Sequence, residues 1–340
     1  MIASERPTIS IAMCTYNGSA HLPEQWQSLI DQKQHPDEVV VCDDQSTDNT
    51  IEILQQLAAE APFPVHISQN STRLGFNKNF EGALSACTGD LIFICDQDDH
   101  WLPEKISRMT QYMIDHPEAQ LTFCNSWVTD EDLNGRESRF WEWIRFDKQA
   151  QKRWKSGDMM DVMLDGNRVM GCATVIRRTY LATILPIPTE IPGYIYDGWI
   201  GLVGAAENTI HFLDIPLQLY RTHGQQEVGV RVEEPMERIR LRDRLSRHRA
   251  KKLAPLREKQ AQLTVINRLL SERVSPDAPG IPLLRRRLSH FTMRSCLPHD
   301  RIKRLGPVLN SLRQGNYKRY ADVAANWYAP YLAALGDLLE

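Results

Sequence analysis

Short apolar runs alternate with longer amphipathic stretches along the first two thirds of the chain. Apolar runs of this length predict buried strands, and the stretches between them have the spacing of helices. Strands that alternate with helices form right-handed βαβ units, which predicts an α/β fold with a mostly parallel sheet flanked by helices. We expect strands at 8–14, 39–42, 65–67, 91–95, 121–124 and 171–176, and helices at 20–31, 48–60, 77–87, 103–116 and 197–206.

The strand predicted at 91–95 ends in three carboxylates within four positions, at Asp96, Asp98 and Asp99. If the backbone stays extended, Asp96 and Asp98 project to the same side and can face one divalent cation, while Asp99 points elsewhere. Like charges this close repel, and a bound cation or a proton relieves the repulsion. The alternative is a solvated acidic turn before a helix that has Pro103 in its first turn.

Two other predicted strands also end in polar clusters, a turn that begins with Thr15, Tyr16 and Asn17 and the pair Asp43-Asp44. Ligands of parallel sheets bind at these carboxyl ends. The chain lacks both GxGxxG after the first strand and GxxxxGK[ST], so we expect a cation to neutralise any bound phosphate. Asp43 or Asp44 offers an acceptor for the imide N–H of uracil or thymine, although an Asx turn explains the pair equally.

The net charge of −3 hides a strong asymmetry along the 340 residues. Residues 1–230 carry a net charge of −15, and residues 231–320 carry +15. A chain of this length also exceeds the usual single domain. The sequence therefore predicts an acidic domain at 1–230 and a basic helical region at 231–340.

The seven cysteines are scattered and include no CxxC pair, which predicts free buried thiols and does not favour a zinc site. No apolar run reaches 18 residues, and the N-terminus has no charged-then-apolar leader. We therefore expect a cytoplasmic protein, with peripheral association at the inner face of the membrane as a further hypothesis.

The runs SIAMCTYNG, VVVCDDQSTDNT and NSTRLGFNKNFEGALSACTGDLIFICDQDDHW follow one another in order. Together they resemble family 2 glycosyltransferases of the GT-A fold, over roughly residues 7–225. The resemblance implies that Asp44, with the turn of Thr15, Tyr16 and Asn17, contacts base and ribose. It implies that Asp96 and Asp98 hold Mn²⁺ or Mg²⁺, and that a loop with Arg73, Asn77 and Lys78 covers the donor diphosphate; a solvated helix start is the alternative for those three residues.

Asp197 follows Tyr196 where a helix rich in small residues is expected to begin. By the same resemblance it is the catalytic base, although an N-cap role explains an Asp there unaided. The family often has an acidic residue or His before this Asp. A base at this place would deprotonate an acceptor hydroxyl and invert the anomeric centre without a covalent intermediate.

The segment Tyr220-Arg221-Thr222-His223-Gly224 resembles bacterial polysaccharide transferases, in particular rhamnosyltransferase-like members. Arg221 could pair with the leaving diphosphate, and His223 could bind the metal or donate to a phosphate oxygen. The alternative for His223 is an ordinary loop residue. Four tryptophans between the predicted strands could stack on an acceptor sugar or pack surface loops; they are Trp127, Trp141, Trp143 and Trp154.

The basic region predicts a long helix over 237–273 and a second segment at 282–291 that combines Arg residues with apolar ones. Helices of that composition lie on membrane surfaces, and the acceptors of such enzymes are often lipid-linked. The alternatives are a helical hairpin that packs on the acidic domain or on a second subunit. No nucleic-acid motif is present.

These features predict metal-dependent transfer of a sugar from dTDP-rhamnose or a UDP-hexose to a glycan or lipid-linked acceptor, in bacterial surface polysaccharide synthesis. Two alternatives stay open, a non-catalytic nucleotide-sugar or carbohydrate-binding protein and a nucleotidyltransferase that shares the sheet.

Overall fold

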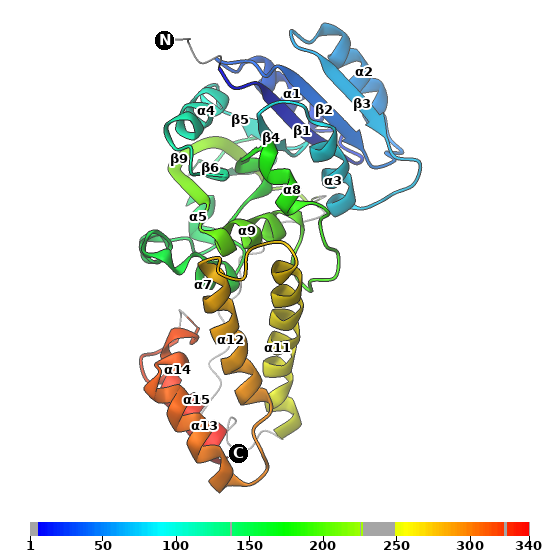
Figure 1. Cartoon of the computed structure of the whole chain (residues 1–340). Coiled ribbons are helices and arrows are strands. Elements are labelled where there is room, and N and C mark those ends of the chain that lie inside the picture. The colour runs from blue at the N-terminus through cyan, green and yellow to red at the C-terminus, as the bar shows by residue number, and fades with distance from the viewer. Residues whose placement is uncertain (1–5, 137, 225, 227–248, 323–324, 340) are drawn as a thin grey trace. The chain divides into compact units, whose positions relative to one another are not determined.

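The structure is a computed structural model that describes residues 6–136, 138–224, 226, 249–322 and 325–339. The chain divides into two compact units, Met1–Arg231 and Val232–Glu340. Figure 1 shows every described strand in the first unit, whereas the described part of the second is built from helices.

Among the described residues, parallel strands in the order β3-β2-β1-β4 form the first half of the sheet. β1 and β4 are buried along their whole length. Continuous apolar runs are typical of central parallel strands because helices cover both of their faces. These strands confirm the predicted ones; they are β1 (Ile9–Thr15), β2 (Glu38–Asp43), β3 (Val65–Gln69) and β4 (Leu91–Cys95).

The second half of the sheet is mixed. β8 (Thr174–Arg177) is antiparallel to β4 and to β6 (Leu121–Thr129), and β9 (Ile210–Arg221) runs parallel to β6. Two short strands complete the sheet, β5 (His100–Trp101) beside β9 and β7 (Ser138–Arg139) beside β6. β4 and β6 are both antiparallel to β8, so they run in the same direction as each other. The carboxyl ends of β1, β2, β4 and β6 therefore lie at the same edge of the sheet.

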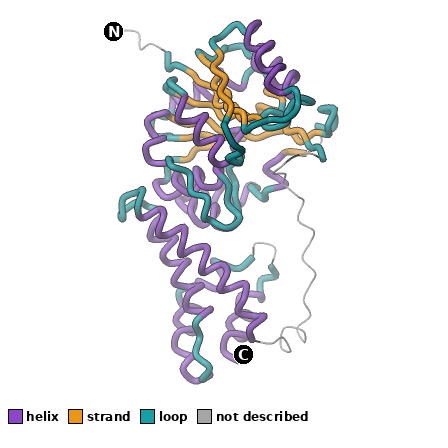
Figure 2. Tube along the Cα trace, turned by 90° about the vertical axis from the view of Figure 1, so that its right-hand side faces the viewer, coloured by secondary structure: helices purple, strands orange, loops and turns teal. Residues whose placement is uncertain are grey.

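Helices lie on both faces of the strands (Figure 2). The chain moves outward in the sheet from β1 through β2 to β3, and then returns past β1 to β4. Because the connections are right-handed, the two helices that precede β3 lie on one face of the sheet and the helix between β3 and β4 lies on the other. α1 contacts α2, whereas α3 contacts α9. The main helices are α1 (Leu22–Ile30), α2 (Thr50–Glu60), α3 (Phe76–Ala86), α4 (Lys105–Asp115) and α9 (Tyr196–Glu207), which confirm the predicted helices.

Shorter helices connect the later strands. They are α5 (Phe140–Trp143), α6 (Lys148–Arg153), α7 (Met159–Leu164) and α8 (Leu181–Ile184), with a π-helical turn at Trp154–Asp158 and 3₁₀ turns at Gly171–Ala173 and Arg178–Tyr180. The strand predicted over 171–176 therefore begins only at Thr174, because the preceding residues form the first 3₁₀ turn.

The tryptophans after β6 fill a core. Trp141 and Trp154 are buried, and both pack against Phe123 and Phe146 with tilted or edge-to-face rings. Such contacts are the usual arrangement of aromatic side chains in protein interiors. The hypothesis that these two tryptophans stack on an acceptor sugar is therefore wrong, while Trp127 and Trp143 remain partly exposed.

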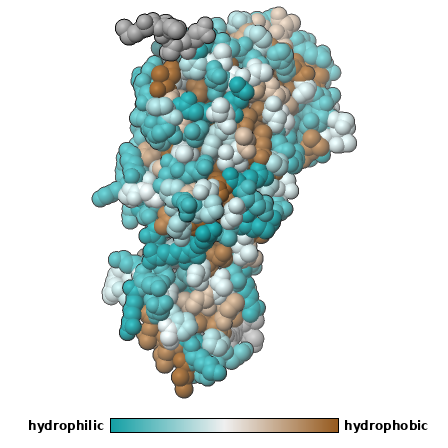
Figure 3. Space-filling view, viewed as in Figure 1, coloured by the Kyte–Doolittle hydropathy of each residue, from teal (hydrophilic) through white to brown (hydrophobic). Residues whose placement is uncertain are grey.

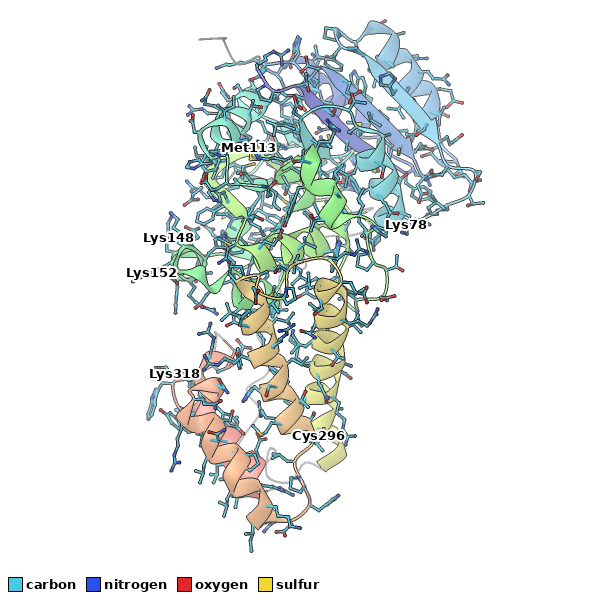
Figure 4. The ribbon with its side chains drawn as sticks, viewed as in Figure 1. Lys78, Met113, Lys148, Lys152, Cys296 and Lys318 are labelled. Carbon is cyan, nitrogen blue, oxygen red and sulfur yellow. The ribbon has the colours of Figure 1, made fainter. Side chains whose placement is uncertain are left out.

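The free thiols follow the sequence prediction for the most part. Six of the seven cysteines are buried, and Cys296 at the end of α12 is exposed (Figure 4). Burial removes these six thiols from solvent oxidants.

The second unit begins, within the described residues, with α11 (Arg249–Ser271), which packs along α12 (Gly280–Ser295). The earlier part of the helix predicted over 237–273 lies outside the described residues. The remaining helices are α13 (Arg301–Arg313), α14 (Asn316–Arg319) and α15 (Ala329–Leu339). None of the helices in the described ranges combines the length and the apolar character that crossing a membrane requires.

The segment 282–291 does not form a membrane-surface helix. Its residues Leu284, Arg287, His290 and Phe291 are buried within the helical unit. The apolar side of α12 is thus already used by packing, and that prediction is wrong for this helix.

Candidate active site

The turn after β1 is fastened to its two neighbouring strand ends. The side-chain amide of Gln97 accepts a hydrogen bond from the Tyr16 N–H at 2.9 Å and donates to the Tyr16 carbonyl at 3.0 Å. A Cβ at Gly18 would lie 2.1 Å from Gln97 Oε1, so a larger residue there would displace the Gln97 side chain from these hydrogen bonds. Asn17 has a positive φ of 46° and accepts from the Thr47 N–H at 2.8 Å. The turn is therefore held in one shape before any ligand binds.

The two carboxylates after β2 serve different loops. Asp43 is fully buried and accepts from the Thr15 hydroxyl at 2.8 Å and from the Ser46 N–H at 2.8 Å. Asp44 accepts from the backbone N–H groups of Leu74 and Gly75, both at 2.7 Å. Asp43 thus holds the turns after β1 and β2 together, and Asp44 holds the loop that leads into α3.

No capping box forms at the start of α2. Asn49 occupies the N-cap position without a side-chain hydrogen bond to the helix. Asp48 provides the side-chain acceptor at the start of the helix instead. Its carboxylate accepts from the Thr50 N–H at 3.1 Å and also from the Ser19 N–H at 3.2 Å. The chain therefore uses the Asp one position earlier, because it reaches both the helix and the turn after β1.

The loop before α3 brings Arg73 over the turn after β1. Its guanidinium carbon lies 3.8 Å from the centre of the Tyr16 ring. Lys78, labelled in Figure 4, pairs with Glu81 at 2.8 Å. The Asn77 side-chain carbonyl accepts from the Tyr196 N–H at 2.7 Å, so Asn77 connects the first turn of α3 to that of α9.

The acidic strand end does not stay extended. β4 stops at Cys95, and the backbone bends at Gln97 and Asp98. Carboxylate oxygens of Asp96 and Asp99 and the Cys172 sulfur all lie within 4.8 Å of one another. The expectation that Asp99 points elsewhere is wrong, because the bend turns it back toward Asp96.

Burial and mutual repulsion raise the pKa of these carboxyls. Burial contributes most to the raised pKa of Asp96, followed by the charges of Asp98, Asp99 and Asp197. Burial, with the charge of Asp98, raises the pKa of Asp99 to about 7. Carboxyls that face one another in a buried site bind a proton or a cation readily, because either relieves their repulsion.

A buried lysine lies beneath this strand end. Lys105 of α4 is fully buried and donates to the Cys172 carbonyl at 2.6 Å and to the Gln218 side chain at 2.5 Å. Gln218 in turn donates to Asp99 at 3.2 Å. Lys105 could not be singled out from the sequence, because it has the appearance of an ordinary charged residue in the first turn of a helix.

Asp197 lies in the first turn of α9, and the N-cap residue is Ile195. The N-cap alternative for Asp197 is therefore wrong. Its carboxylate accepts from the Asn167 side chain at 2.9 Å and from the Gly171 N–H at 3.3 Å. Burial raises the pKa of Asp197 to about 6, against the opposing effect of these hydrogen bonds.

Tyr196 fixes the position of Asp197. Its ring stacks on Phe80 of α3, with the centroids 4.0 Å apart. A Cβ at Gly171 would lie 2.1 Å from the Tyr196 hydroxyl, so the turn before β8 must be glycine at this point. Helix α9 is thus anchored to α3 and to the turn at Gly171–Ala173.

The last strand ends in Arg221 and His223. Arg221 is buried; it pairs with Glu24 at 2.5 Å, donates to the Asp98 carbonyl at 2.8 Å, and also donates to the Glu131 carbonyl. We therefore revise its predicted pairing with a diphosphate, because its guanidinium is engaged in supporting the acidic turn. His223 Nε2 lies 3.0 Å from Asp98 Oδ2, so it does reach the acidic cluster.

The donor atoms gathered here fit a divalent cation. The carboxylate oxygens of Asp96, Asp98 and Asp99 are the hard ligands that Mg²⁺ and Mn²⁺ prefer, and the His223 imidazole is an acceptable ligand for Mn²⁺. The raised pKa values of Asp96 and Asp99 reflect a surplus of negative charge that a cation would balance.

A family model described as glycosyl transferase family 2 matches residues 10–181, about half of the chain. The chain belongs to this family. The matched range contains all three polar strand ends and stops before Asp197.

Curated relatives match parts of this family 2 glycosyltransferase chain. Uncharacterized protein Mb1547 of Mycobacterium bovis is 28% identical over 219 residues, which cover 63% of this chain and 59% of that protein. The abequosyltransferase RfbV of Salmonella typhimurium is 27% identical over 42% of each chain. The dTDP-rhamnosyl transferase RfbG of Shigella flexneri is 32% identical over 30% of this chain and 37% of that protein. The chain thus spans less than two thirds of each of these relatives.

Two solved structures share the fold. S. aureus TarS 1-349 in complex with UDP-GlcNAc aligns with a TM-score of 0.52 and 15% identity, over 92% of this chain and 89% of that one. The mannosyltransferase PcManGT from Pyrobaculum calidifontis in complex with GDP-Man and Mn²⁺ aligns with a TM-score of 0.50 and 15% identity, over 99% and 88%. These similarities, with the family match, confirm the GT-A fold.

Proposed function

We propose that this chain transfers a sugar from a nucleoside-diphosphate sugar to a hydroxyl of a glycan or lipid-linked acceptor. The observation that carries the proposal is the buried Asp197 carboxylate, fixed by Asn167 and Gly171 and close enough to Asp96 to raise its pKa. A fixed carboxylate facing an acidic, cation-binding strand end is the arrangement that general-base attack on a metal-held donor requires.

The proposed mechanism follows from the two groups. Asp197 accepts the proton of the acceptor hydroxyl as that oxygen attacks the anomeric carbon, and the bond to the diphosphate breaks on the opposite face. The product is inverted. With its pKa raised to about 6, the Asp197 carboxylate is mostly ionised at neutral pH and still basic enough to take a proton.

The metal proposal rests on donor chemistry. Asp96 and Asp98 would hold Mn²⁺ or Mg²⁺, with His223 as a further ligand and Asp99 adjoining. A bound divalent cation stabilises the negative charge that develops on a leaving diphosphate. Arg221 holds this acidic turn in position through the hydrogen bond that its guanidinium donates to the Asp98 carbonyl.

The nucleotide proposal rests on the other two strand ends. Tyr16 offers a ring face, Asp44 offers a carboxylate, and Thr15 and Asn17 hold the turn between them. Asp44 already accepts from two backbone N–H groups, so an imide N–H would have to use its remaining lone pairs. We propose dTDP-rhamnose or a UDP-hexose as donor, supported by the resemblance to the rhamnosyl transferase RfbG.

The donor is tested by screening nucleotide sugars for thermal stabilisation with and without Mn²⁺, followed by an assay of nucleoside diphosphate release. We expect the selected donor to stabilise the protein only when the metal is present. Asp197→Asn should bind the donor as tightly as the unchanged protein and release nucleotide at least about 100-fold more slowly. A protein that binds without turnover in both forms would instead be the non-catalytic nucleotide-sugar-binding protein.

We also propose that the helical unit docks on anionic lipid through α13. Ile302 is 77% exposed there, and Leu305 and Leu309 are exposed one and two turns further along. Figure 3 shows brown side chains gathered over the place of α13 in Figure 1. Exposed Arg301, Lys303 and Arg313 flank this apolar stripe and would contact acidic headgroups.

Co-sedimentation with vesicles of phosphatidylglycerol tests the lipid proposal, with phosphatidylcholine vesicles for comparison. Ile302→Glu should abolish sedimentation with the acidic vesicles. Asn310→Glu adds the same charge at another exposed position of α13 and should retain most of the binding. Equal binding by both variants, or none by the unchanged protein at low salt, would remove the proposal. A second subunit on α13 would appear instead as a larger mass in solution.

A further inference from the structure

Three side chains of types that can bind metals lie close to one another, away from the acidic residues that follow β4. His116 caps the end of α4, Glu118 lies in the turn before β6, and His211 is the second residue of β9. His116 Nδ1 lies 3.2 Å from Glu118 Oε1, and His211 Nε2 lies 3.6 Å from the same oxygen. All three donor atoms are within 4.8 Å of one another.

This cluster lies at the opposite edge of the sheet from the candidate active site. β6 begins at Leu121, which pairs with Ile176, and Ile176 pairs in turn with Ile92 near the start of β4. Asp96 follows the other end of β4. The two sites are therefore separated by the length of the strands and share no ligand.

We propose that His116, Glu118 and His211 form a second metal site, specific for a borderline divalent cation such as Zn²⁺, Co²⁺ or Ni²⁺. Bonds of about 2.0–2.2 Å place neighbouring tetrahedral ligands about 3.3–3.5 Å apart, close to the two distances that the side chains already have. Two imidazoles and one carboxylate favour these cations over Mg²⁺, which prefers oxygen ligands alone. Water completes the coordination.

The groups around the cluster support this role. The Tyr112 hydroxyl lies 3.2 Å from His211 Nδ1, so it can fix the ring with Nε2 turned toward the site, as outer hydrogen bonds do for metal-bound histidines.

Arg177 shapes the turn that carries His116. Its guanidinium donates to the carbonyls of Met113, His116 and Ala119, at 2.6, 3.2 and 2.7 Å. The positive charge of Arg177 disfavours the binding of a cation nearby. The negative charge of the Glu118 carboxylate offsets this repulsion. The bound metal would tie the end of α4 to the start of strand β9, so its role is structural and independent of the proposed transfer reaction.

Titration of the metal-free full-length protein with CoCl₂ tests the site, because tetrahedral or five-coordinate Co²⁺ bound to histidine has a visible absorption spectrum. Calorimetry with ZnCl₂ gives the affinity. We expect one equivalent of either ion to bind at this site, besides any ion held by the acidic strand end, and at least about tenfold weaker binding of that equivalent in His116→Ala and in Glu118→Gln, whose side chains are partly exposed.

Two controls make the result specific. His66→Ala removes a histidine from another His–Glu pair of this unit and should leave the affinity unchanged. Asp96→Asn should likewise retain the Co²⁺ spectrum, which separates this site from the proposed Mn²⁺ site. Binding that is equal in His116→Ala and the unchanged protein, or that is lost equally in His66→Ala, would overturn the proposal.

Discussion

The two strands that flank β1 in the sheet, β2 and β4, end in clustered aspartates that serve opposite purposes. After β2, Asp43 and Asp44 are buried, and backbone and side-chain donors surround both. After β4, Asp96 and Asp99 face each other and Asp98, and burial with this mutual charge raises their pKa values. Carboxylates of the first kind stabilise a fold, whereas those of the second kind cost stability until a cation binds.

The difference originates in the turn that follows each strand. The chain after β2 supplies N–H groups from Ser46 and, further along, from Leu74 and Gly75. The chain after β4 bends, and the Gln97 side-chain amide forms its hydrogen bonds with Tyr16 in the turn after β1. The three aspartates therefore lie beside one another. Sequence composition alone does not separate the two clusters, since both are short runs of Asp after an apolar strand.

Asp96→Asn is the change expected to separate the two clusters most strongly. Removing one of the proposed metal ligands should lower kcat/KM by about 10³–10⁴-fold, because metal stabilisation of a leaving diphosphate contributes several kcal/mol. The same substitution should raise the free energy of unfolding in metal-free buffer by about 1 kcal/mol, because it relieves the repulsion among buried carboxyls. Activity assays and urea denaturation with and without Mn²⁺ measure both effects. A less stable variant with unchanged metal dependence would contradict the assignment.

Asp197→Asn tests whether the acidic cluster needs a separate base. The substitution keeps the size of the side chain and should lower kcat by about 10²–10⁴-fold while KM for the donor changes little. The unchanged enzyme should show an acidic limb in kcat/KM near the pKa of about 6 given to Asp197 by its burial, with activity rising as pH increases. A pH profile without this limb, together with near-normal activity of the variant, would assign the base to another group.

Asp43→Ala probes the structural cluster and should act on stability rather than on chemistry. The substitution leaves the Thr15 hydroxyl and the Ser46 N–H without their acceptor, which costs about 1–3 kcal/mol for each buried donor that stays unpaired. Urea denaturation should show this loss at any Mn²⁺ concentration. The comparison between the two clusters fails if Asp43→Ala is as stable as the unchanged protein.

The sequence predicted the strand ends well because continuous apolar runs fix where the buried strands stop. Through the resemblance to family 2 glycosyltransferases it also assigned Asp96, Asp98 and Asp197 to one site, and that assignment stays a prediction. It did not predict the bend at Gln97, which turns Asp99 inward, nor the support that Lys105 provides. Each depends on partners from distant strands, such as Gln218 of β9 and Tyr16 after β1, and single-sequence patterns report only neighbours along the chain.

The free energy of unfolding should also depend on pH. The pKa of Asp197 is raised to about 6 in the folded state, above its ordinary value near 4 in the unfolded chain. Between these values the folded protein binds more protons than the unfolded one, so stability falls as pH rises from about 4 to about 6. The fall should be of the order of 1–3 kcal/mol for this group, and Asp197→Asn should remove it. Urea denaturation of both proteins at pH 5 and 7.5 without metal measures the difference. If the variant keeps the full pH dependence, burial does not raise the pKa of Asp197 as the proposed base requires. The contrast between hydrogen-bonded aspartates and mutually repelling ones would then depend on the carboxylates after β4 alone.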